Sequence, residues 1–274
     1  MSGFSVEWLD LREAADHRAR DERLLRIAAN WVDDLKTPDR VIVDLGSGTG
    51  STLRALKKAN PKMSSMHWRL VDNDCTVLAE AIRRHAKENL IEKHILDLSE
   101  TQKLPLENVC LVTTSALLDL VSADFIRELS DRIKRAADFH SVGLYSALNY
   151  DGHIEWTPFH PLDGRILDSF NTDQRRDKGF GLALGPDAAE FLQSQFGASE
   201  FEVFSASSPW RLNPSDETLT NSLIDGIATV ALQSSSLTNS EVMEWKEFRM
   251  KNVKSCSCFV GHVDVLVLSK KPFG

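Results

Sequence analysis

The sequence predicts an α/β protein in which a mostly parallel sheet carries helices on both faces. Short segments rich in β-branched and apolar residues alternate with segments whose apolar residues recur at helical spacing. A glycine-rich turn at residues 46–50 stands between the first of these strands and the helix after it. Because a helical crossover returns the chain to the same end of the sheet, this alternation is typical of parallel strands covered on both faces.

The elements keep this rhythm over the first half of the chain. We expect strands at residues 41–44, 66–72, 94–98, 109–114 and 141–148. We expect helices at residues 21–35 and 51–59, after the N-cap residue Asp74, and around Phe125 to Ile133.

The rhythm fails after Tyr150. Residues 150–186 are rich in glycine, proline, aspartate and aromatic residues, have no sustained period, and are too many for a simple connection. Aromatic residues are depleted in disordered segments, so we expect an ordered cap here. The rest of the chain is expected to hold a helix at 186–196, a strand at 201–204, helices at 216–232 and 241–250, and a last strand at 262–268.

These elements predict a single domain over residues 1–274. It is expected to contain a seven-stranded sheet, N-terminal helices at 1–38, the cap insertion at 150–186 after strand five, and a helical insertion at 213–252 before the last strand.

Composition limits the partners of this chain. It has 274 residues, is 42% hydrophobic and carries a formal charge of -8, so it offers no broad basic face to nucleic acid. It has no run of about 18 apolar residues and no secretory leader, which predicts no membrane association and a cytoplasmic location. The four cysteines lack paired spacing, so neither a disulfide framework nor a metal site is expected.

The glycine-rich turn has the composition of a nucleotide or nucleoside site. Glycine lets the backbone turn sharply and approach a ligand closely, and the next helix presents free N–H groups. Asp72 ends the second strand, where a carboxylate accepts hydrogen bonds from both hydroxyls of a ribose. Asp97 ends the third strand at the same edge of the sheet, within reach of the exocyclic amine of a base.

The spacing of the glycines separates two kinds of cofactor. Gly46, Gly48 and Gly50 alternate behind Asp44, which gives D-L-G-S-G-T-G in place of the G-x-G-x-x-G of dinucleotide sites. This segment resembles motif I of the class I methyltransferases that depend on S-adenosyl-L-methionine (AdoMet). The resemblance extends to "LVDND" after the second strand and to "LDL" on the adenine side. It implies AdoMet as the cofactor and the strand order 3-2-1-4-5-7-6.

The same resemblance implies a set of cofactor-binding residues. In that family the motif I loop lies under the methionyl part and the ribose, Asp72 matches the ribose carboxylate, and Asp97 matches the adenine contact. The expected residues are Asp44, Gly46, Ser47, Gly48, Asp72, Asn73, Asp97, Leu98 and Ser115.

The acceptor of the methyl group is expected to be a small molecule. The chain reads "TTSALLDLVS" after strand four, without the Asn/Asp-Pro-Pro-Tyr that methyltransferases of base amines or glutamine amides often carry. The acceptor pocket is expected beyond strands four and five, closed by the cap, and its expected residues are Tyr150, Trp156, Phe159, Asn171, Gln174 and Lys178. If a proton must be removed, the candidate bases are His153, Asp151 and His160.

Other functions stay open at this point. A non-catalytic AdoMet-sensing module would bind the cofactor without transfer, and an aminopropyl transferase would use decarboxylated AdoMet. A dinucleotide oxidoreductase is disfavoured by the alternate glycines. The charged stretch with Arg12, His17, Arg18 and Arg20 is interpreted as a solvated face rather than as ligands of the AdoMet carboxylate. The oligomeric state is open.

Overall fold

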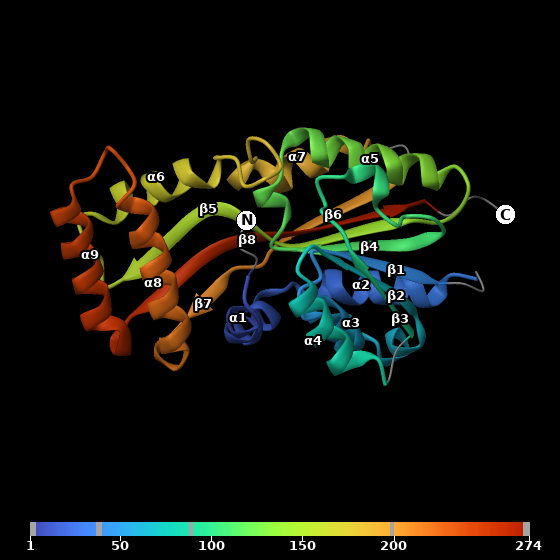
Figure 1. Cartoon of the computed structure of the whole chain (residues 1–274), viewed down its shortest axis with the longest axis horizontal. Coiled ribbons are helices and arrows are strands. Elements are labelled where there is room, and N and C mark those ends of the chain that lie inside the picture. Colours follow the sequence, from blue (N-terminus) through green and yellow to red (C-terminus); the bar gives the residue numbers. More distant parts are fainter. Residues whose placement is uncertain (1–3, 37–39, 88–89, 198–199, 271–274) are drawn as a thin grey trace.

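A mixed sheet runs through the whole molecule (Figure 1). The computed structural model describes residues 4–36, 40–87, 90–197 and 200–270. Its strands are β1 (Val41–Leu45), β2 (His67–Asp72), β3 (Leu90–Ile95), β4 (Val109–Ser115), β5 (Gly143–Thr157), β6 (Phe201–Ser207), β7 (Trp210–Leu212) and β8 (Ser257–Ser269). Its α-helices are α1 (Val6–Ala19), α2 (Glu22–Asp34), α3 (Ser51–Ala59), α4 (Cys75–His85), α5 (Ala123–Ala137), α6 (Asp163–Gln174), α7 (Ala188–Gln195), α8 (Glu217–Ala231) and α9 (Asn239–Asn252).

The strand order confirms the predicted fold class. The order is β3-β2-β1-β4-β5-β8-β6, and the short β7 pairs with β8 beside this path. Strands β1 to β5 pair in parallel with one another, whereas β8 runs antiparallel to β5 and β6. With β8 in the place of the seventh strand, this is the predicted order 3-2-1-4-5-7-6, and β7 is an additional strand.

Helices cover both faces of the sheet, as expected. Helices α1 to α4 lie on one face, and α5 and α7 lie on the other (Figure 1). Successive residues of a strand point to opposite faces, so Ile42 packs in the core that contains Leu53 of α3, while Val43 packs in the core that contains Ile126 of α5. This double burial explains why the strand reads as a continuous apolar run.

Several strand boundaries differ from the sequence analysis. The last strand begins at Ser257, five residues before the expected start at residue 262, and the strand expected at 201–204 extends to Ser207. The third strand occupies Leu90–Ile95, so the "LDL" segment follows the strand instead of ending it. The fifth strand does not end at residue 148 but continues to Thr157, paired with β8 as far as Ser257. Residues 150–157, the first eight residues of the expected cap, are therefore sheet.

The sequence contains an alternating pattern that indicates the extension of β5, but the loop-like composition of residues 150–186 conceals this pattern. Ile154 and Trp156 are buried while Glu155 and Thr157 are exposed, which is the alternation of a half-buried strand. Gly152, at φ 89°, lies within a register shift between Tyr150 and Ile154, so the segment reads as irregular although it is a strand with a bulge.

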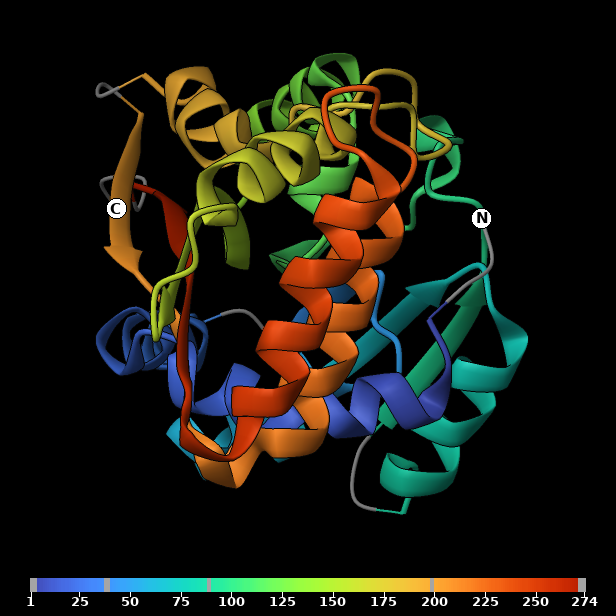
Figure 2. The same ribbon diagram turned by 90° about the vertical axis from the view of Figure 1, so that its left-hand side faces the viewer.

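The far ends of β5 and β8 carry a second layer of helices. Helices α8 and α9 lie side by side in front of the sheet when the molecule is viewed from this end (Figure 2). Trp156 of β5 packs edge-on against Trp245 of α9, with ring centroids 5.9 Å apart. The guanidinium of Arg249 lies 5.0 Å from the Trp156 ring centroid and is only 1% exposed. The expected helices before the last strand therefore form part of one continuous core.

Across the described ranges, no helix is both long and apolar enough to cross a membrane. The cytoplasmic location stays a prediction.

Candidate active site

The glycine-rich turn after β1 has the backbone geometry that its composition requires. Gly46, Gly48 and Gly50 have φ values of 68°, 51° and 83°, in the region that residues with a Cβ rarely adopt. The N–H groups of Gly46 and Ser47 donate to the Val71 carbonyl at 2.9 and 3.0 Å, which ties the turn to the end of β2. The alternate glycines are thus three backbone positions that need glycine.

The carboxylate of Asp72 faces this turn. Its Oδ2 accepts a hydrogen bond from the Gly48 N–H at 2.9 Å, and its Oδ1 accepts one from the Asp74 N–H at 3.1 Å. Burial raises the pKa of Asp72, and these two backbone N–H groups act in the opposite direction. A partly buried carboxylate at the end of β2 therefore lies against the turn, as the sequence predicts.

The turn and Asp72 border a cavity of about 180 Å³. It is lined by Phe4, Leu9, Arg12, Asp16, Gly46, Ser47, Gly48, Thr49, Ser51, Thr52, Asp72, Asn73, Asp74, Val77, Leu98, Ser115, Ala116, Leu117, Leu120 and Phe180. Seven of the nine residues expected to bind the cofactor are in this lining, and the other two, Asp44 and Asp97, are not.

Asp44 lies behind the cavity wall. Its carboxyl group is 1% exposed, and Oδ1 accepts a hydrogen bond from the Thr113 hydroxyl at 2.7 Å. Burial raises its pKa to about 7, against the lowering effects of Thr113 and Arg20. The Asp44 carboxyl group therefore bonds to β4 and lies outside the cavity lining.

Asp97 is exposed and caps its own turn. Its Oδ1 accepts the Ser99 N–H at 2.9 Å, and hydrogen bonds from Ser99 lower its pKa. Because β3 ends at Ile95, three residues before the expected end at residue 98, Asp97 follows the strand; Leu98 lines the cavity and Asp97 does not.

Helix α1 closes the cavity, contrary to the predicted solvated face. Arg12 lines the cavity, and Arg20 is 3% exposed; of the three arginines, Arg18 is the one that is exposed, in an ion pair with Asp216. Ion pairs from Glu13 to Arg54 of α3 and from Asp10 to Arg84 of α4 hold the helix over the strand ends. The sequence shows which residues of α1 are charged, but it does not show that they form ion pairs with side chains of α3 and α4.

Arg12 is held rigidly at the cavity wall. Its Nε and Nη2 donate to the two Asp16 oxygens at 2.9 and 3.2 Å, and its guanidinium carbon lies 5.1 Å from the Trp210 ring centroid. The indole N–H of Trp210 donates to the same carboxylate at 2.9 Å. Arg12 Nη1 makes no hydrogen bond within the described ranges, so it stays available to a ligand.

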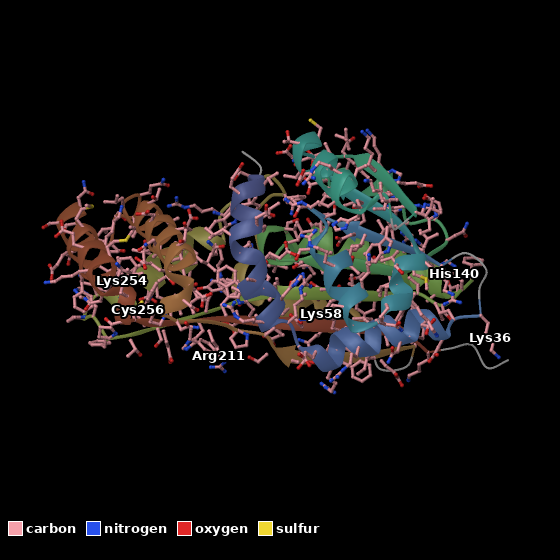
Figure 3. The ribbon with its side chains drawn as sticks, turned by 90° about the horizontal axis from the view of Figure 1, so that it is seen from below. Lys36, Lys58, His140, Arg211, Lys254 and Cys256 are labelled. Atoms are coloured by element: carbon pink, nitrogen blue, oxygen red, sulfur yellow. The ribbon has the colours of Figure 1, made fainter. Side chains whose placement is uncertain are left out.

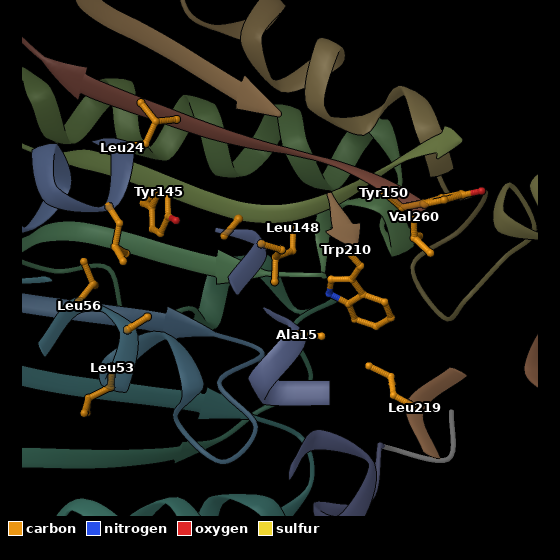
Figure 4. Packing of buried hydrophobic residues seen from close by; sticks show 14 of the residues in the cluster. Ala15, Leu24, Leu53, Leu56, Tyr145, Leu148, Tyr150, Trp210, Leu219 and Val260 are labelled. Atoms are coloured by element: carbon orange, nitrogen blue, oxygen red, sulfur yellow. The ribbon is translucent and has the colours of Figure 1, made fainter. Parts of the chain in front are cut away.

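The expected acceptor residues do not line this cavity. The Tyr150 hydroxyl donates to Asn171 at 2.8 Å, and its ring points beyond Trp210 toward the end of β5 (Figure 4). Trp156 packs in the far core, as described above. The others are Phe159, which is 74% exposed, Lys178, which pairs with Asp173, and the half-buried Gln174. The extension of β5 carries these residues past the rim of the sheet.

The three candidate bases are also remote from the cavity lining. His153 lies 3.0 Å from Glu155 and packs on Phe259, and Asp151 accepts the His153 N–H. His160 is 6% exposed and packs on Phe248. Their surroundings are those of strand and core residues.

Phe180 is the residue of the predicted cap that does reach the cavity. It lies between Gly179 and Gly181, both at positive φ, and its ring packs edge-on against Phe125 of α5 at 5.6 Å. The "GFG" sequence was a usable signal, because glycines on both sides of an aromatic residue often mark a tight turn.

We expect Gly48→Ala to destabilise the protein by about 1–2 kcal/mol, the cost of a Cβ at left-handed φ. The new Cβ would also lie 2.9 Å from Leu9 Cδ1 of α1. Chemical denaturation measures the loss. Gly164→Ala is the control, because Gly164 belongs to helix α6 and a Cβ added there would meet no atom within 4 Å outside the backbone of that helix. Equal stability of the Gly48 variant and wild type would contradict the backbone argument.

Comparisons with known proteins find similarity only among solved structures. No protein-family profile matches the chain, and no curated protein matches it in sequence. A cyclopropane synthase from Mycobacterium tuberculosis is 13% identical with a TM-score of 0.45, covering 89% of this chain and 83% of that chain. The plantazolicin methyltransferase BpumL, solved with S-adenosylhomocysteine (SAH), is 10% identical with a TM-score of 0.47, covering 97% and 88%. Coclaurine N-methyltransferase, also solved with SAH, is 11% identical with a TM-score of 0.45, covering 90% and 72%.

The sheet itself identifies the fold. Its strand order is the one that the motif I resemblance implies, and the turn with three positive-φ glycines follows β1, where that motif belongs. This chain therefore has the fold of the class I AdoMet-dependent methyltransferases.

Proposed function

We propose that this protein transfers the methyl group of AdoMet to a small-molecule acceptor. The observation that carries the proposal is the Asp72 carboxylate lying against the glycine turn inside one cavity. A carboxylate at the end of the second strand suits a ribose, and a turn of bare backbone followed by a helix N-terminus suits the polar groups of a nucleoside.

The residues present fit AdoMet along the length of the cavity. Asp72 offers two oxygens to the ribose hydroxyls. Val77 and Leu98 offer an apolar slot for the adenine, next to the amide of Asn73. The N-terminus of α3 and Arg12 offer donors to the cofactor carboxylate.

The chain's own contribution to transfer is alignment and exclusion of water. AdoMet, when bound, supplies a methyl group on a sulfonium that leaves readily. Leu117, Leu120 and Phe180 form the apolar part of the wall beyond Ser115, and we propose that the acceptor packs there. Side chains that hold two reactants in line and exclude water can lower a barrier without an acid–base pair.

Labelled AdoMet tests the proposed transfer. We expect calorimetry to show binding of AdoMet and SAH, and methyl-labelled AdoMet to label a compound in a low-mass metabolite extract only when the protein is present. Binding without any labelled product would favour the sensing module. Tighter binding of decarboxylated AdoMet would favour the aminopropyl transferase, and binding of NAD alone would favour the oxidoreductase.

We expect Arg12→Met to weaken SAH binding by about tenfold, the effect of losing one hydrogen bond to a charged group. Methylthioadenosine lacks the carboxylate, so its affinity should stay the same. Calorimetry with both nucleosides measures the difference, and Arg18→Met is the control because Arg18 lies outside the cavity lining. Equal losses for both nucleosides would mean that the substitution disturbs the cavity as a whole.

A further inference from the structure

A second cavity of about 210 Å³ lies beside the first, between the α1–α2 junction and α3. It is lined by His17, Arg20, Glu22, Leu25, Arg26, Ala55, Lys58 and Ala59. Figure 3 shows Lys58 near the middle of the face seen from below. Nothing in the proposed methyl transfer uses this cavity.

The cavity is basic in an acidic protein. Arg20, Arg26 and Lys58 are its cations and Glu22 is its one carboxylate, whereas the chain as a whole has a formal charge of -8. Among the residues that the structure describes, Arg26 and Lys58 form no ion pair, and both are exposed at the cavity rim. These two cations are therefore available to a ligand.

Arg20 adds a buried cation to the inner wall. It is 3% exposed, and its Nη2 donates to the Ser115 hydroxyl at 2.9 Å. Its Nε and Nη1 are buried and have no hydrogen-bond partner within the described ranges. The nearby groups Asp16, Asp264 and Tyr145 favour its charged form. These two N–H groups are enclosed by protein atoms, so Arg20 contributes its positive charge to the cavity wall, and this charge favours an anion in the cavity.

We propose that this cavity binds a phosphate group. Three cations against one carboxylate match a doubly charged oxyanion better than a carboxylate with one charge, and arginine suits the geometry of phosphate. Leu25, Ala55 and Ala59 give the cavity an apolar wall, which accommodates the organic part of a phosphomonoester. The phosphate source is either free phosphate or such an ester.

Titration of the cofactor-free protein tests the site. Inorganic phosphate and glycerol phosphate are titrated by calorimetry at constant ionic strength, with acetate as the singly charged comparison. We expect phosphate to bind, acetate to bind at least about tenfold more weakly, and Arg26→Gln and Lys58→Gln each to weaken phosphate about tenfold. Tighter binding of the ester identifies a phosphomonoester as the ligand, and equal binding identifies free phosphate.

Lys254→Gln is the matched control, because it removes one exposed lysine charge on α9's side of the molecule (Figure 3). It should leave phosphate binding unchanged. If Arg26→Gln, Lys58→Gln and Lys254→Gln weakened phosphate binding equally, the effect would be one of net charge alone, and the proposal would be overturned. Displacement of phosphate by SAH would also overturn it, because the ion would then occupy the first cavity. Both outcomes are independent of whether the protein transfers methyl groups.

Discussion

Replacing Asp72 by alanine is expected to weaken AdoMet and SAH binding by about 1–3 kcal/mol, which is roughly five- to 150-fold in dissociation constant. Asp72 is the cavity carboxylate that touches the glycine turn, through the Gly48 N–H at 2.9 Å. The variant removes the acceptor for the ribose hydroxyls and leaves them unpaired in a partly buried site. Titration calorimetry with both nucleosides measures the loss.

Asp97→Ala is the matched control for this substitution. It removes a carboxylate just after the neighbouring strand, but Asp97 is exposed, accepts a hydrogen bond from the Ser99 N–H and lies outside the cavity lining. We expect nucleoside affinity to change little, and Asp72→Asn, which keeps one acceptor oxygen, to fall between wild type and alanine. Unchanged affinity in Asp72→Ala would remove the basis for the proposed cofactor site.

Asp44→Asn is expected to change the pH dependence of stability by about 4 kcal/mol, the free energy that corresponds to the pKa difference of this group. Burial raises the pKa of Asp44 from 3.8 to about 7, so the folded protein holds the proton more tightly than the unfolded chain. The stabilisation from protonated Asp44 is therefore fully present below about pH 4 and is lost as pH rises through about 7.

The measurement compares urea unfolding of wild type and Asp44→Asn over this range. The amide keeps an oxygen for the Thr113 hydroxyl but cannot ionise, so the variant should gain stability relative to wild type as pH rises. Titrating groups that do not interact with Asp44, such as Asp119 with a pKa raised to about 6, cancel in the difference. A difference that stays constant with pH would show that Asp44 does not ionise in this range.

The sequence alone determined the sheet's parallel core and the glycine turn. Strands such as Val41–Leu45 are buried on both faces, so their apolar runs are visible without any partner. The glycines at 46, 48 and 50 are local as well, because positive φ is a property of each residue's own backbone. The position of Asp72 is also set locally. It is the last residue of β2, and the alternation of apolar and polar residues within that strand indicates where the strand ends.

Tertiary structure alone decided where Tyr150, Trp156 and Arg12 lie relative to the cavity. From the sequence, Tyr150 and Trp156 are interpreted as cap residues, because the composition and a bulge conceal the continuation of β5. That segment is a strand only because it pairs with β8, more than a hundred residues later. From the sequence, Arg12 is interpreted as a surface charge. In the structure Asp16 and Trp210 hold it at the cavity wall, and Trp210 is remote from Arg12 in sequence. Which face of α1 meets the strand ends depends on ion pairs with α3 and α4, and such long-range contacts leave no periodic pattern in the helix itself.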